Sequence, residues 1–364
     1  MNVAAMPART PPCAQVVRRQ TATGALLAVV AMAALLVLPA LPASAQDAQD
    51  SPAVEETQVA PPSTPAPLSS SEDRPAWLWF EYGERAFDEG ELGEALQFYT
   101  LALERRSVFP EAIARLADIY AAQAEPELAL STYQRALERA GALVVADDQH
   151  AIRYRVARLQ RLIPEYHGME STLLHIVGEE EEFSAAQFSR LRQAMRDAFA
   201  RDGLDSTLQL YRLDTPLAVE AHVTLGWFYH RSGRDARSIP HSLFAVINIV
   251  SEVARELRSR DPEYQLASLA TLLDNPNAFS PTAARLVLDY MEEAQLQRAL
   301  YYLAIASRES GLTTRGAELL RTLATSESAG EYRDLARRQL ASPWVEPLLK
   351  LPPVPESLPP APAL

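Results

Sequence analysis

The sequence predicts an all-α protein: a solenoid of helical hairpins followed by a second helical half in which the pairing is irregular. Three observations support this fold class. Large apolar, small and aromatic residues recur after 34 residues between positions 79 and 137. Within each copy the apolar residues follow the i, i+3, i+4, i+7 spacing of one helix face. The helical pattern then continues beyond residue 165 without the fixed period.

The first 45 residues have the composition of an export signal. They contain no acidic residue, and Arg18 and Arg19 precede an uncharged run that ends at Ala45. Small residues before that point suit a signal peptidase, so we expect a signal peptide (1–45) cleaved after Ala45 and a mature protein in the periplasm or cell envelope of a bacterium. The alternative is a retained signal anchor, which would be the protein's only attachment to a membrane.

Composition excludes several classes of function. The only cysteine, Cys13, lies in the leader, so the mature chain has no disulfide, thiol nucleophile or cysteine ligand. The formal net charge is −13, and cleavage would remove three more arginines, which argues against a nucleic-acid partner. Residues 46–74 are rich in Pro, Ser and acids and are predicted to be a disordered linker. Residues 346–364 form a Pro-rich tail, either a solvated end or a docking peptide.

The first predicted hairpin spans 75–107 and the second 110–141. Gly83 allows the second helix of its pair to approach closely, and Gly90 ends the first helix where positive φ is needed. Pro110 and Pro126 fall in first turns, where proline is tolerated. The residues expected to pack within the two pairs are Trp79, Tyr82, Gly83, Gly90, Ala95, Tyr99 and Ala102, then Ala117, Tyr120, Ala129, Tyr133 and Ala136.

This pattern of large apolar residue, Gly or Ala, a glycine before the turn, and Ala-aromatic-Ala resembles the tetratricopeptide repeat (TPR) family, most closely in the first copy. The resemblance implies a non-enzymatic scaffold that binds a protein or peptide, without a cofactor. It also implies that the first helices line a concave groove. On that basis the expected groove residues are Trp77, Phe80, Glu81, Glu84, Phe87, Asp88, Glu111, Ala114, Arg115, Asp118 and Ala122.

Acids predominate on that face. The version of the family that clamps a peptide carboxylate uses lysine, arginine and asparagine there, so this groove suits a neutral or cationic segment better. Trp77 and Phe80 favour a binding role for the face, and the alternative is a solvated helix face.

A third helix, 147–163, keeps Ala151 and Tyr154 at the 34-residue offset, but Pro164 follows where a partner helix would begin. We therefore expect a capping helix that completes a TPR-like region at 75–164. Region 165–345 is expected to contain degenerate repeats, at Leu225-Gly226 and at Leu303-Ala304. The apolar run 243–250, with Pro240 at its start, predicts a buried helix in which Asn248 finds a hydrogen-bond partner.

No residue pattern indicates a metal site or a nucleotide loop. His222 and His230 are two helical turns apart but have no carboxylate at a ligand offset. The segment from Arg308 to Gly311 resembles the Glu-Ser-Gly fragment of lytic transglycosylases, which would make Glu309 a general acid. The rest of that family's motif is absent, so peptidoglycan cleavage is the alternative hypothesis and a scaffold is the leading one.

Overall fold

The computed structural model describes residues 74–178, 189–274 and 281–351, and α-helices and short 3-10 turns are the regular elements of these residues. The predicted all-α fold is confirmed. The leader with its cleavage site, residues 46–73 of the linker and residues 352–364 of the tail lie outside the described residues. Within the described ranges, no helix combines the length and the apolar character needed to cross a bilayer.

The chain divides into two compact units, residues 1–105 and 106–364. The described part of the first unit is a single hairpin of α2 (Ala76–Asp88) and α3 (Leu92–Arg105). Trp79, Gly83 and Ala86 of α2 are buried against Ala95, Tyr99 and Ala102 of α3.

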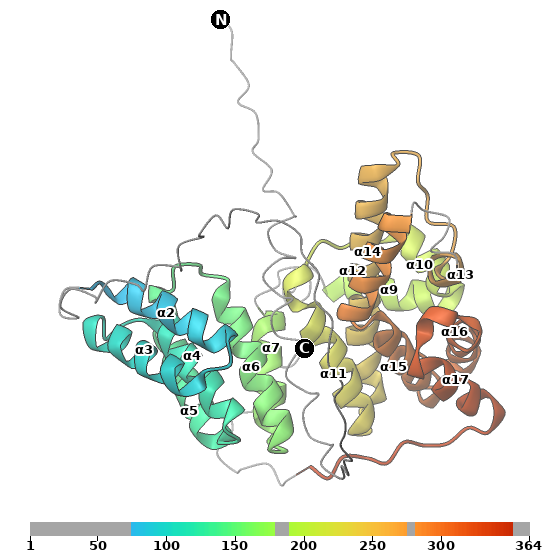
Figure 1. Cartoon of the computed structure of the whole chain (residues 1–364). Helices are drawn as coiled ribbons and strands as arrows, with labels where there is room; N and C mark the ends of the chain where they lie inside the picture. Colours follow the sequence, from blue (N-terminus) through green and yellow to red (C-terminus); the bar gives the residue numbers. More distant parts are fainter. Residues whose placement is uncertain (1–73, 179–188, 275–280, 352–364) are drawn as a thin grey trace, which may run out of the picture. The chain divides into compact units, whose positions relative to one another are not determined.

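The second unit contains four further hairpins, which can be followed in Figure 1. They are α4 (Pro110–Ala122) with α5 (Pro126–Leu137), α6 (Asp148–Leu162) with α7 (Tyr166–Gly178), α11 (Val219–Arg231) with α12 (Asp235–Arg260), and α15 (Leu296–Glu309) with α16 (Thr313–Thr325). The remaining helices are α9 (Ser189–Asp202), α10 (Leu204–Leu210), α13 (Leu269–Asp274), α14 (Pro281–Glu293) and α17 (Glu331–Ala341).

All five hairpins turn in the same way. In each, a backbone N–H after the turn donates to a carbonyl five residues earlier, which is the long bond of a Schellman turn. The bonded pairs are Glu91 to Ala86, Glu125 to Tyr120, Glu165 to Gln160, Arg234 to Tyr229 and Leu312 to Ser307, at 2.7–2.9 Å. Gly90, Ala124, Gly233 and Gly311, at the matching turn position, have positive φ. The fold is therefore TPR-like throughout, and its later pairs keep the hairpin after they lose the 34-residue spacing.

Each hairpin also has a small residue at the point where its two helices cross, three residues before the Schellman carbonyl. We call these the seam residues: Gly83, Ala117, Ala157, Gly226 and Ala304, all of them buried. A Cβ on Gly83 would lie 2.5 Å from Cε1 of Tyr99, and one on Gly226 would overlap the Ser242 hydroxyl. The small side chain is what allows the helices to approach this closely.

The third hairpin corrects two expectations. Residues 147–163 do not form a lone capping helix, because α6 packs along α7, which begins at Tyr166 just after Pro164. Proline is tolerated near the start of a helix, so Pro164 can end α6 without preventing the formation of α7. The 34-residue register is also wrong here: Ala151 is exposed, and the buried seam residue is Ala157.

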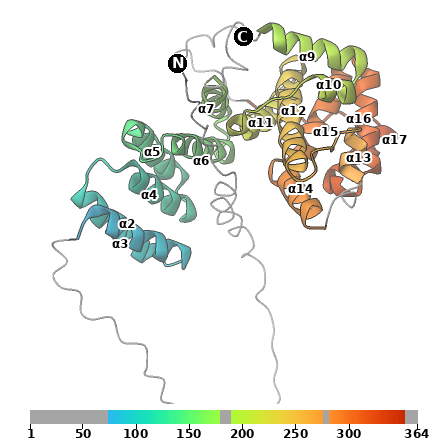
Figure 2. The same cartoon turned by 90° about the horizontal axis from the view of Figure 1, so that it is seen from above.

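Helix α12 forms the centre of the second half. Figure 2 shows it among α9, α11, α14 and α15, and it packs against all four. The predicted burial of 243–250 is confirmed, but α12 begins at Asp235, so Pro240 lies inside the helix and not at its start. Asn248 has the expected hydrogen-bond partners, because its Oδ1 accepts from the N–H and hydroxyl of Thr215 and its Nδ2 donates to the Phe244 carbonyl.

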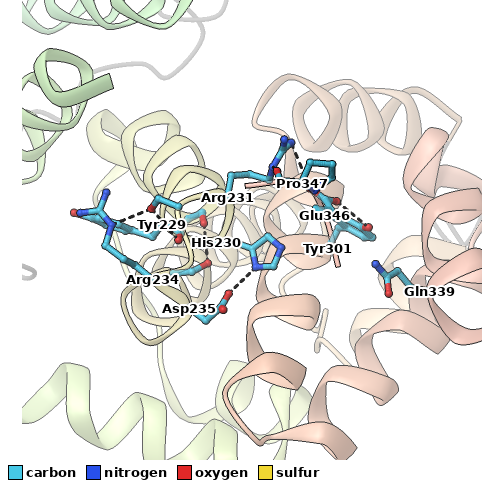
Figure 3. Close-up of polar contacts among 12 residues, drawn as sticks. Tyr229, His230, Arg231, Arg234, Asp235, Tyr301, Gln339, Glu346 and Pro347 are labelled. Carbon is cyan, nitrogen blue, oxygen red and sulfur yellow. Dashed lines mark hydrogen bonds and ion pairs between the residues drawn. The ribbon is translucent and has the colours of Figure 1, made fainter. Parts of the chain in front are cut away.

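The start of the proline-rich tail is held to the second half through buried Glu346, although most of its residues are exposed. Residues 343–351, which we call the C-terminal strap, lie along the second half. Buried Glu346 accepts a 3.1 Å hydrogen bond from the Tyr301 hydroxyl and forms a 3.5 Å ion pair with Arg231 (Figure 3). The Arg231 side chain donates to the Pro347 carbonyl, and its own carbonyl accepts from Leu349 N–H.

Candidate functional site

The first-helix face predicted as a groove is partly exposed in α2. Trp77, Glu81 and Asp88 are exposed, and 61% of Trp77 is accessible. Phe80, Glu84 and Phe87 are half-buried. Glu84 accepts a 2.5 Å hydrogen bond from the hydroxyl of Tyr99 on α3. The residues of this face that are exposed enough to contact a partner are thus Trp77, Glu81 and Asp88.

The corresponding face of α4 is internally paired. Asp118 accepts hydrogen bonds from the Tyr133 hydroxyl and from Arg115 and Arg155, the last at 3.0 Å. Glu111 accepts a 2.7 Å hydrogen bond from the Val144 N–H, and Ala114 is buried. Burial and the neighbouring Asp118 raise the pKa of Tyr133, so its hydroxyl stays a neutral donor.

Glu84 and Tyr99 therefore repeat, 34 residues later, as Asp118 and Tyr133. In both hairpins a carboxylate one residue after the seam is tied to a tyrosine on the second helix. These two acids join the helices of their own pair. The predicted acidity of the groove is consequently smaller than the sequence suggests, because part of it is used inside the fold.

A cleft of about 320 Å³ lies in the second unit, between α6, α11 and α15, with Leu173 of α7 contributing to its wall. Its lining combines apolar and basic groups: Tyr154, Ala157, Arg158, Arg161, Leu173, Glu220, Thr224, Gln295 and Arg298. This volume is at the lower end of the range for ligand sites.

The cleft is basic, because its arginines outnumber its carboxylate. Glu220 is paired with Arg158, whose Nη2 and Nε donate to its two oxygens at 2.8 and 3.0 Å. Arg161 and Arg298 lie against the ring of Trp227, at 5.8 and 5.3 Å from its centroid. Burial lowers the pKa of Arg298, and the nearby Arg161 lowers it further.

The sequence analysis missed this cleft, although its residues occupy the predicted groove positions. Arg158 and Trp227 each follow a seam residue by one position, as Glu84 and Asp118 do. Glu220 and Arg298 precede a seam residue by six positions, as Trp77 and Glu111 do. The signal was present in the seam residues, but the spacing between them is no longer 34 after Ala117, so the groove positions could not be extended.

Glu309 has none of the surroundings of a buried general acid. It is exposed at the end of α15 and borders a cavity of about 10 Å³ beside His230 and Glu346, which is room for about one water molecule. A carboxyl group that acts as general acid on a glycosidic bond has its pKa raised by burial, and this exposed position provides no burial. The structure therefore gives the transglycosylase alternative no support.

The two histidines that share a face of α11 have separate partners. His222 Nδ1 lies 3.0 Å from His241 Nδ1 in the buried interface with α12, while His230 Nδ1 lies 2.6 Å from Asp235 Oδ1. Among the residues that the structure describes, no group of three or more His, Cys, Asp or Glu side chains is arranged to hold a metal ion.

No known family profile matches the chain. An uncharacterised protein of Treponema pallidum is 26% identical over 241 residues, which cover 66% of this chain and 63% of that protein. An uncharacterised protein of Borreliella burgdorferi is 22% identical over 239 residues, which cover 58% of this chain and 73% of that protein. The chain thus matches less than two thirds of the length of the Treponema relative.

The structural neighbours are TPR proteins. A Podospora anserina protein described as a kinesin light chain with nearly identical TPR-like repeats has a TM-score of 0.37 at 12% identity, covering 74% of this chain and 99% of that one. The TPR2AB domain of yeast Sti1, in complex with an HSP90 peptide, has a TM-score of 0.26 at 16% identity, covering 72% and 95%. The repeated Schellman turns and seam residues carry the TPR-like assignment.

Proposed function

We propose that this chain is an exported, non-enzymatic TPR-like scaffold that binds a protein segment along its first-helix faces in the bacterial cell envelope. The cleft between α6, α11 and α15 carries the proposal, since a first-helix face that is hollowed and lined by charged and aromatic groups suits an extended segment. The TPR-like fold suggests a protein-interaction scaffold in general. The composition of residues 1–45 supports export.

In the first unit, we assign a second contact to Trp77, Glu81 and Asp88. A large exposed aromatic side chain beside two carboxylates offers apolar area and negative charge together, which suits a neutral or cationic segment. The other charged residues of this face are hydrogen-bonded within the fold and contribute by holding the helices in place. They are Glu84, Glu111, Arg115 and Asp118. Phe80 and Phe87 lie half-buried on the same helix, and the Phe80 ring packs against Tyr99 of α3.

Site-specific photocrosslinking in intact cells tests the proposal. A photoreactive benzoylphenylalanine replaces exposed Leu162, next to the cleft residue Arg161, in one variant and exposed Leu286 on α14 in the control variant, so both variants lose one leucine and keep the arginines of the cleft. The cleft variant is expected to give one discrete protein adduct that the control lacks and that Trp227→Ala abolishes. Mass spectrometry of the recovered chain should place its N terminus at Gln46. Equal adducts at both positions, or none at the cleft, would refute the scaffold role.

A further inference from the structure

The cleft between α6, α11 and α15 contains positive charge that the fold does not neutralise. Its one carboxylate, Glu220, has both oxygens occupied by Arg158. Within the described ranges, neither Arg161 nor Arg298 has an ion pair with a carboxylate, and Nη1 of Arg298 donates a 2.8 Å hydrogen bond to Oε1 of Gln295. Arg161 is exposed, but Arg298 is half-buried, and a charge that leaves water normally pairs with an opposite charge.

The two arginines are held in position for a ligand. Both guanidinium groups lie against Trp227, a contact that favours cations and orients their planar forks. They come from different first helices, Arg161 from α6 and Arg298 from α15, with Trp227 on α11. The two arginines and the tryptophan thus come from three separate hairpins of one compact unit. The indole ring is the group that both guanidinium groups contact, although their helices are far apart in sequence.

The burial of Arg298 also favours the binding of an anion. Burial lowers the pKa of its guanidinium because the charged form loses water, and Arg161 adds repulsion of the same sign. A guanidinium nevertheless remains protonated at neutral pH. An anion placed between the two arginines would relieve both costs, and a carboxylate matches the fork of an arginine with two parallel hydrogen bonds.

We infer that this cleft binds an acidic protein segment, whose side-chain carboxylates pair with Arg161 and Arg298 while its apolar groups contact Tyr154 and Leu173. The inference rests on the proposed function, because it names the kind of segment that the scaffold holds. A protein segment fits better than nucleic acid, since the chain carries a net charge of −13 that would repel a polyanion outside the cleft. The cleft is thus basic, whereas the face of α2 is predicted to be acidic.

The test measures the binding of fluorescein-labelled hexaglutamate, hexaglutamine and hexalysine peptides to the mature protein by fluorescence anisotropy at low salt. Hexaglutamate is expected to bind at least about tenfold more tightly than the other two, with an affinity that falls as salt rises. Arg161→Gln and Arg298→Gln should each weaken it by about tenfold or more. Arg285→Gln, which removes an arginine whose side chain is 85% exposed on α14, is the matched control and should leave binding unchanged.

Several results would overturn the inference. One is equal binding of the three peptides. Another is undiminished binding by Arg161→Gln, which changes an exposed residue and should fold normally. The third is full competition by millimolar acetate, which would mean that the site binds small anions only. The photocrosslinking experiment separates this inference from the proposed function. An adduct at position 162 formed with a segment that lacks acidic residues would leave the scaffold role intact and remove the acidic ligand.

Discussion

At the scale of single residues, the fold assigns different tasks to side chains of the same type. Glu81 and Asp88 face solvent, while Glu84 and Asp118 accept hydrogen bonds from Tyr99 and Tyr133 within their own hairpins. A helical sequence pattern places all of these acids on one face. It does not reveal the tyrosine on the neighbouring helix, so the distinction between a recognition acid and a structural acid needs the packed pair.

The buried histidine pair predicts how stability depends on pH. Burial lowers the pKa of His222 to about 3 from its ordinary 6.5, and burial together with His222, Arg192 and Arg237 lowers that of His241. The folded chain therefore keeps both histidines neutral at a pH where the unfolded chain protonates them. Stability from this pair is complete above about pH 6.5 and falls as the pH drops, by up to about 1.4 kcal/mol per histidine and pH unit.

Urea unfolding at pH 7 and pH 5 checks this expectation. The wild-type protein should lose stability at pH 5, and His222→Gln should show a smaller loss because one of the two protonation sites is gone. His175→Gln, which alters an exposed histidine on α7, is the control and should keep the wild-type difference between the two pH values. If His222→Gln retained the whole difference, the buried pair would not be its source.

At the scale of helices, the seam residues determine how closely the two helices of a pair approach. Gly83→Leu would place its side chain in the ring of Tyr99, so we expect overpacking to destabilise the protein by about 1 to 3 kcal/mol, measured as a lower urea midpoint. Gly93→Leu on α3 is the control, because a Cβ there meets no atom within 4 Å and should leave the midpoint nearly unchanged. Similar midpoints for the two variants would show that the helices do not cross at Gly83.

The C-terminal strap stabilises the second half through Glu346. Glu346→Ala would leave the buried Tyr301 hydroxyl without its acceptor and remove the ion pair with Arg231. We expect a loss of about 1 to 3 kcal/mol in the free energy of unfolding, measured by urea denaturation. Lys350→Ala, at an exposed strap residue, should change it by less than about 0.5 kcal/mol. Equal small effects would mean that the strap lies on the surface without contributing to stability.

At the scale of the whole molecule, hairpins of one design occur in both units, and their first-helix positions differ in charge. In α2 and α4 the position after the seam residue carries an acid, Glu84 or Asp118, whereas in α6 it carries Arg158. In α15 the position six residues before the seam carries Arg298. Between the hairpins of the second unit, α9 and α10 follow α7, and α13 and α14 follow α12. These insertions explain why the second half appears irregular in sequence although its hairpins are regular.

The sequence by itself determined the helical class, the first two hairpins and the burial around Asn248. These features depend on local periodicity, on turn glycines and on small residues opposite large ones, all of which lie within about one repeat of each other. The third hairpin was missed because Pro164 looked like a stop signal, and proline is compatible both with the end of one helix and with the approach to the next.

Only the tertiary structure decided where charge accumulates. Arg161 and Arg298 are separated by more than a hundred residues, yet they approach the same indole ring on α11. The packing of the strap on Tyr301 and the use of Asp118 inside its own hairpin are decided in the same way. Contacts between distant segments depend on the whole core, whereas helix formation depends mainly on neighbours along the chain.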